Sequence, residues 1–162
     1  MGPKDTIRHT MDLADQVIET YLGDLDDHDL LVRPVPGMNP IAWQMGHLIA
    51  SEYQMMEWIR PGASPTLPPG FIEAHGRQTS AGDDSSMFHS KARYLELYRA
   101  QRAATRGILA EVGEAELDRA DASFPPYAPT VGAILNMQGG HPLMHAGQFV
   151  AVRRLLGKPV TI

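Results

Sequence analysis

Two histidines in the last quarter of the chain lie at a spacing that suits metal binding. His141 and His145 are four residues apart, so on a helix their side chains lie on the same face, one turn apart. Two imidazoles at this spacing can bind one divalent metal ion. The alternative is a pair of core histidines satisfied by the backbone or by each other. In either case the rings need partners, because an unpaired buried polar group costs about 1–3 kcal/mol.

The segment that carries this pair forms one stripe of side chains. At about 100° of rotation per residue, the stripe falls within about 40° of His141 and comprises Ile134, Met137, His141, His145, Gln148 and Val152. Its ends are apolar, so we expect it to face the core. We expect the Gln148 amide to orient a ligand or substrate. Pro142 cannot donate a hydrogen bond to residue 138 and follows two glycines, so the sequence predicts a kink or a break there.

A third histidine, His47, lies midway along a second, largely apolar segment. It shares the more polar side of that segment with Trp43, Gln44 and Ser51. His47 is interpreted either as a third metal ligand or as a hydrogen-bonded core residue. Gln44 and Ser51, one helical turn before and after it, are candidates to hydrogen bond near the site. Three aromatic side chains either line a pocket or pack in the core: Trp43, Trp58 and Tyr98.

The other four histidines give weaker signals. His9 lies off the apolar stripe of its segment and His28 stands in an acidic connector, so we expect both in solvent. His89 is expected on the surface near the start of a helix. His75 stands in a long segment rich in proline and glycine, residues 61–85, which is predicted to be either a lid over a site or a flexible crossover.

The composition excludes several classes of protein. The 162 residues include no cysteine, which rules out disulfide scaffolds, thiolate metal sites and cysteine nucleophiles. A formal net charge of −5 argues against a nucleic-acid partner, which requires a basic surface. The sequence contains no apolar run of about 18 residues that would cross a membrane, and its first 15 residues lack the apolar run of a signal peptide. We therefore expect a cytoplasmic protein that acts on a small molecule.

Apolar residues recur at the helical period in four parts of the chain. The predicted helices are bounded by capping and stop residues and span 5–22, 40–60, 90–112 and 130–156. Asn39 is expected to cap the second helix, with Pro40 in its first turn. No stretch shows the alternation of a strand, and one short helical turn is predicted at 114–117. The pattern predicts one all-α domain over residues 1–162, a four-helix bundle with long crossover loops.

Three stretches of the chain resemble the motifs of the DinB/YfiT-like superfamily. They are residues 31–48 (LVRPVPGMNPIAWQMGHL), 141–148 (HPLMHAGQ) and 153–159 (RRLLGKP). Each motif alone is loose, whereas all three in this order and spacing are specific and extend the likeness over nearly the whole chain. The resemblance implies an up-down-down-up four-helix bundle. It also implies a divalent metal ion, zinc, nickel or iron, bound by His47, His141 and His145.

The resemblance further implies a reaction class. Members of the family with known activity include thiol-dependent S-transferases and isomerases that use low-molecular-weight thiols such as bacillithiol or mycothiol. Without cysteine in the chain, the sulfur would come from the cosubstrate. No carboxylate falls on the faces of the histidines, and Glu52 points elsewhere on its helix, so no general base for hydrolysis is identified. The alternatives are a metal-dependent hydrolase and a non-catalytic, stress-related metal-binding or dimerisation module. The resemblance is compatible with a homodimer.

Overall fold

The computed structural model describes residues 1–80 and 84–161, and its secondary structure is helical. The long helices are α1 (Pro3–Gly23), α2 (Ile41–Ile59), α4 (Lys91–Glu111) and α6 (Val131–Leu155). The short ones are α3 (Phe71–Ala74), α5 (Glu114–Leu117) and the 3-10 turns η1 (Asp29–Leu31) and η2 (Arg77–Thr79). The described residues contain no β-strand, only one isolated bridge between Ala120 and Thr130. The predicted all-α class is therefore confirmed.

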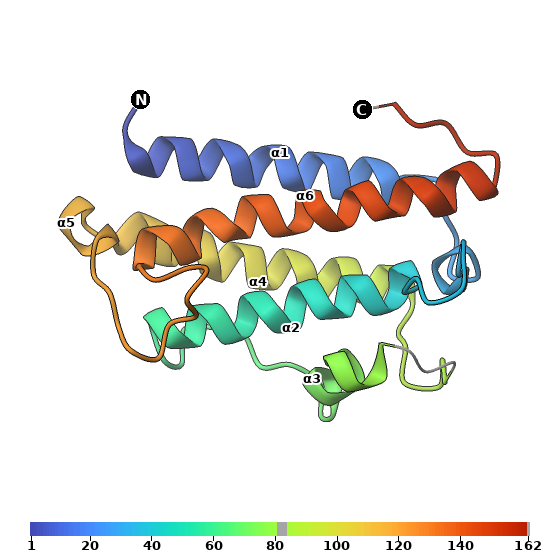
Figure 1. Cartoon of the computed structure of the whole chain (residues 1–162), viewed down its shortest axis with the longest axis horizontal. Coiled ribbons are helices and arrows are strands. Elements are labelled where there is room, and N and C mark those ends of the chain that lie inside the picture. Colours follow the sequence, from blue (N-terminus) through green and yellow to red (C-terminus); the bar gives the residue numbers. More distant parts are fainter. Residues whose placement is uncertain (81–83, 162) are drawn as a thin grey trace.

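The four long helices lie side by side, with α1 against α6 and α2 against α4 (Figure 1). In this view α1 and α6 run in one direction and α2 and α4 in the other, which is the up-down-down-up order. Because α2 and α4 are parallel, the chain between them has to return along the bundle, and the described residues 60–80 and 84–90 belong to this connection. No helix within the described residues is both long enough and apolar enough to span a membrane.

The helix ends follow local chemistry at most of the predicted positions. The side chains of Ser90 and Thr130 accept backbone N–H groups in the first turns of α4 and α6, at 3.3 and 3.1 Å. The cap predicted at Asn39 is wrong, because α2 begins after Pro40 and the buried Asn39 Oδ1 has no hydrogen-bond partner. The backbone carbonyl of Asn39 instead accepts a hydrogen bond from the side chain of Gln44 at 2.8 Å.

The long connection between α2 and α4 is more ordered than the sequence indicates. It contains α3 and η2, and α3 packs against α2 with Phe71 in the core. His75 is only 1 % exposed, so its ring is part of this packing rather than of a flexible loop. A glycine makes the close approach possible, because a Cβ atom at Gly46 would lie 2.0 Å from the His75 ring. Residues 81–83 of the predicted lid or crossover lie outside the described residues.

Helix α6 is continuous across Pro142, so the predicted break does not occur. The carbonyl of Gln138, which loses its usual donor to the proline, accepts a hydrogen bond from Arg102 Nη1 at 2.6 Å. Gly139 serves close packing of the helices, because a Cβ atom there would lie 2.4 Å from the side chain of Thr10 on α1. Gly139 and the carbonyl that Pro142 leaves without its usual donor thus both contact other helices.

Candidate metal centre

Three histidines come together where α2 and α6 face each other. His47 belongs to α2, and His141 and His145 belong to α6; one potential ligand atom of each ring lies within 4.8 Å of the other two. The Nε2 atoms of His141 and His145 are 3.2 Å apart. The ring centroid of His47 is 5.3 Å from that of His141 and 5.4 Å from that of His145. Among the described residues no aspartate or glutamate belongs to this cluster.

The donor atoms suit a divalent metal ion of intermediate hardness. Zinc–nitrogen bonds of about 2.0–2.1 Å at tetrahedral angles would separate two ligand nitrogens by about 3.4 Å. The 3.2 Å between the Nε2 atoms of His141 and His145 is close to that value. Imidazole ligands suit zinc, nickel and iron, whereas calcium and magnesium prefer oxygen ligands. The residues present therefore fit a zinc-like ion, with the His47 ring requiring a small shift.

Burial keeps the three rings in the neutral form that can coordinate a metal. Burial lowers the pKa of His141 to about 4 and that of His145 to about 3, and the neighbouring imidazoles contribute to both shifts. Burial also lowers the pKa of His47, although a hydrogen bond with the His75 backbone opposes the shift. At neutral pH a metal ion would therefore have few protons to displace.

His145 is oriented by a glutamine from the opposite helix. Gln44 Oε1 accepts a hydrogen bond from His145 Nδ1 at 2.8 Å, and its amide orientation is fixed because Gln44 Nε2 donates to the Asn39 carbonyl. The proton on Nδ1 leaves the lone pair on Nε2, which faces His141. The sequence singles out Gln44 as a partner near His47, but it bonds across to α6. The register of α2 against α6 decides that Gln44 pairs with His145. The helical period within one segment of sequence gives no information on that register.

His47 is enclosed by aromatic and loop contacts. The Trp43 indole stacks on its ring with the centroids 4.8 Å apart and the planes 7° from parallel. The Trp43 Nε1–H donates to Thr79 Oγ1 at 3.2 Å, which joins α2 to η2. Ser51 Oγ lies 3.5 Å from His47 Nε2. Trp43 is therefore buried and also contacts one of the three histidines.

The other two aromatic candidates pack away from the histidine cluster. Tyr98 donates a hydrogen bond to Asp15 at 2.8 Å, and Trp58 packs against an apolar cluster that includes Met11. Glu52 is 2 % exposed and pairs with Arg102 rather than with the histidines. Glu52 therefore points away from the histidines, as its place on the helix predicts.

The other residues named from the sequence differ in how deeply they are buried. Gln148 is half-buried on α6, one turn beyond His145. His9 and His28 are exposed, as expected. His89 is half-buried instead of lying on the surface, because its ring stacks on Phe71 with the centroids 5.6 Å apart.

The orienting role of Gln44 predicts a loss of metal affinity in Gln44→Leu. We expect zinc to bind about 10–100-fold more weakly, because His145 loses the acceptor that fixes its tautomer. Competition with a chromogenic chelator measures the affinity. Gln54→Leu, at an exposed position of the same helix, is the control and should bind zinc as the wild type does. Equal weakening in the two variants would show that Gln44 has no specific role.

The low pKa values predict that the metal-free protein loses stability in mild acid. In the folded state His75 has a pKa of about 4 and His145 of about 3, whereas the unfolded value is 6.5. Between these values the unfolded chain binds protons that the folded chain does not. The free energy of unfolding should therefore fall as pH decreases below 6.5, by at most about 1.4 kcal/mol per pH unit for each such ring. Urea titrations with a chelator present, from pH 7.5 to 4.5, measure this slope; a flat profile would contradict the burial of neutral rings.

Comparisons with known proteins address the fold and the family. A family model described as the DinB superfamily matches residues 10–149. A crystal structure of a conserved protein from Enterococcus faecalis superposes with a TM-score of 0.76, covering 98 % of this chain and 99 % of that one at 19 % sequence identity. That likeness shows the fold alone. No functionally curated protein matches the chain.

Proposed function

We propose that this chain, which belongs to the DinB superfamily, is a metal-dependent enzyme that transfers a low-molecular-weight thiol to a small electrophile or uses the thiol for an isomerisation. The observation that carries the proposal is the cluster of His47, His141 and His145, whose ligand atoms lie within 4.8 Å of one another. Three neutral protein ligands leave the full charge of a divalent ion and at least one open position, the pattern of catalytic rather than structural sites.

The cation is proposed to be zinc, nickel or iron, because the ligands are imidazoles. When bound, it would stabilise the thiolate form of a thiol cosubstrate at neutral pH. The chain itself offers no sulfur nucleophile, since it contains no cysteine.

The side chains around the centre have separate tasks in this proposal. Gln44 holds the His145 proton on Nδ1 and keeps Nε2 free. Trp43 covers one face of the His47 ring and keeps water from it. Gln148, half-buried one turn beyond His145, is proposed to orient the substrate through its amide. The small-molecule substrate would approach from the side on which His47 and His141 are only partly buried.

Hydrolysis is the less favoured reaction. A hydrolase of this kind commonly uses a protein general base within hydrogen-bond reach of the attacking water. Among the described residues no carboxylate joins the histidine cluster, and Glu52 is held by Arg102 and Thr105. Attack by a thiolate needs no such base, so the site supports thiol transfer better.

A thiol panel tests the proposal. Protein loaded with zinc, nickel or ferrous iron is incubated with bacillithiol, mycothiol or glutathione and with chlorodinitrobenzene or an epoxide. We expect metal-dependent C–S bond formation with at least one thiol, with release of chloride or opening of the epoxide, and no such product with His141→Ala protein. Metal binding without turnover would favour the non-catalytic module. Diol formation from the epoxide without any thiol would favour the hydrolase.

A further inference from the structure

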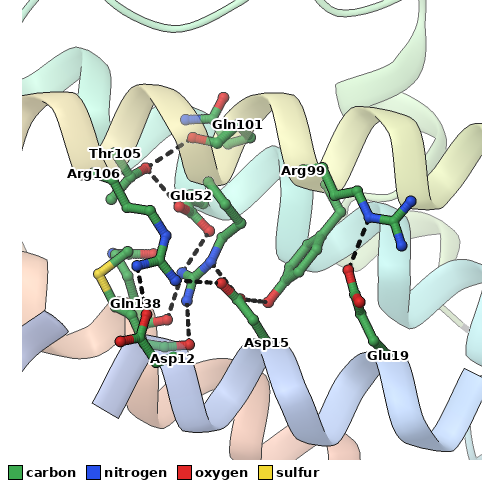
Figure 2. Close-up of polar contacts among 12 residues, drawn as sticks. Asp12, Asp15, Glu19, Glu52, Arg99, Gln101, Thr105, Arg106 and Gln138 are labelled. Carbon is green, nitrogen blue, oxygen red and sulfur yellow. Dashed lines mark hydrogen bonds and ion pairs between the residues drawn. The ribbon is translucent and has the colours of Figure 1, made fainter. Parts of the chain in front are cut away.

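A polar layer crosses the interior of the bundle between two apolar clusters. One cluster includes Leu48 of α2 and Phe149 of α6, and the other includes Met56 of α2 and Ile134 of α6. The layer takes side chains from all four long helices (Figure 2), namely Asp15, Glu52, Arg102, Thr105 and Gln138. None of these groups has a part in the proposed chemistry, so their burial needs another explanation.

Arg102 is the centre of this layer and contacts the three other long helices. Its side chain is 3 % exposed. Its Nε donates to Asp15 Oδ1 at 2.7 Å and its Nη2 to the Met11 carbonyl at 3.2 Å, both on α1. Its Nη1 donates to Glu52 Oε2 on α2 at 3.1 Å and to the Gln138 carbonyl on α6 at 2.6 Å. The rigid fork of the guanidinium can serve acceptors in several directions at once, which a lysine cannot do.

The bond to Gln138 has a specific cause in the sequence of α6. In a regular helix the amide of residue 142 would donate to the carbonyl of residue 138. Pro142 has no N–H, so that carbonyl would lack a donor inside the bundle. Arg102 supplies the missing donor from α4. The helix is continuous through the proline, and the proline lies between His141 and His145.

Arg102 Nη1 donates hydrogen bonds to both helices that carry the metal ligands, α2 and α6. Glu52 follows His47 by five residues on α2, and Gln138 precedes His141 by three on α6. Thr105 Oγ1 donates to the other Glu52 oxygen at 2.5 Å, which fixes the orientation of the carboxylate. Arg102 Nη1 therefore ties α2 to α6 about one turn from the imidazoles.

We propose that Arg102 is a positioning residue for the metal centre. It replaces the hydrogen bond that Pro142 removes and binds Glu52, and so it sets the register of α2 against α6 and the aim of His47 toward the other two rings. This inference rests on the proposed metal site, and it predicts a functional coupling between Arg102 and Pro142 that a general stabilising role would not produce.

Cobalt binding in a set of variants tests the inference. Arg102→Lys keeps the charge but loses the fork, so we expect Co²⁺ to bind about tenfold more weakly, with a changed d–d absorption spectrum. Adding Pro142→Ala restores an N–H donor to the Gln138 carbonyl and should recover most of the affinity and the spectrum. Arg106→Lys is the matched control, since Arg106 pairs with Asp12 and Asp15 on α1; it should bind Co²⁺ as the wild type does.

A second pair of variants covers the case in which Arg102→Lys does not fold. Glu52→Gln/Arg102→Met removes both buried charges, and it is measured with and without Pro142→Ala, with the same rescue expected. Wild-type affinity in Arg102→Lys, or weakening that Pro142→Ala does not relieve in either background, would overturn the inference while leaving the metal site intact. Failure of the wild type to bind Co²⁺ would instead refute the metal site and this inference with it.

Discussion

Replacing His145 with alanine is expected to reduce the metal content from about one ion per chain to a small fraction of one. His145 is the most buried of the three rings, at 6 % exposure, and its Nε2 lies 3.2 Å from that of His141. Two remaining imidazoles on different helices bind a divalent ion far more weakly than three. Elemental analysis after dialysis against zinc measures the content.

Two further variants separate ligand loss from misfolding. His145→Asn keeps an N–H donor close to the position that bonds Gln44 but lacks the Nε2 lone pair, so it should fold and still fail to hold zinc. His89→Ala removes a half-buried histidine outside the cluster and should retain about one ion. Unchanged metal content in the folded His145 variants would remove His145 from the ligand set.

Replacing Gly46 with alanine is expected to destabilise the protein, although alanine is the better helix former by about 1 kcal/mol. The new Cβ would lie 2.0 Å from the Cδ2 atom of His75. That ring cannot rotate away, because its two nitrogens bond the Phe71 carbonyl and the Tyr94 hydroxyl at 2.8 Å each. Overpacking of this kind costs about 1–3 kcal/mol. Urea denaturation of the metal-free protein measures the change.

The same substitution at Gly107 is the control, and it should have the opposite sign. Gly107 lies inside α4, and an added Cβ atom there would meet open space, so Gly107→Ala should stabilise the protein by about 0.5–1 kcal/mol. If both variants were stabilised to the same extent, the result would contradict the close packing of residues 71–79 on α2.

The helices could be predicted from the sequence because their signals are local. Apolar residues at the helical period place α1, α2, α4 and α6 within a few residues of their observed bounds, and Ser90 and Thr130 cap where a hydroxyl before a helix is expected to cap. The face shared by His141 and His145 follows from the same period. His47 lies near them because of the way α2 packs on α6. The family resemblance implies this packing, whereas the helical period does not.

The features that the sequence did not reveal all depend on contacts between distant segments. His75 can be buried only because Gly46 has no side chain, and these two residues are far apart in the sequence. Gln44 bonds His145 rather than a ring of its own helix. Pro142 does not break α6, and Arg102 donates from another helix to the carbonyl that the proline leaves without its usual donor. A local pattern can mark such residues as unusual, but only the packed structure shows what satisfies them.

Anomalous diffraction at the zinc edge, from crystals grown with zinc, is the most direct test of the metal centre. We predict one strong peak between α2 and α6, at about 2.0–2.1 Å from one nitrogen of each of His47, His141 and His145. Zinc-containing crystals in which no peak lies within bonding distance of all three rings would contradict the proposed centre.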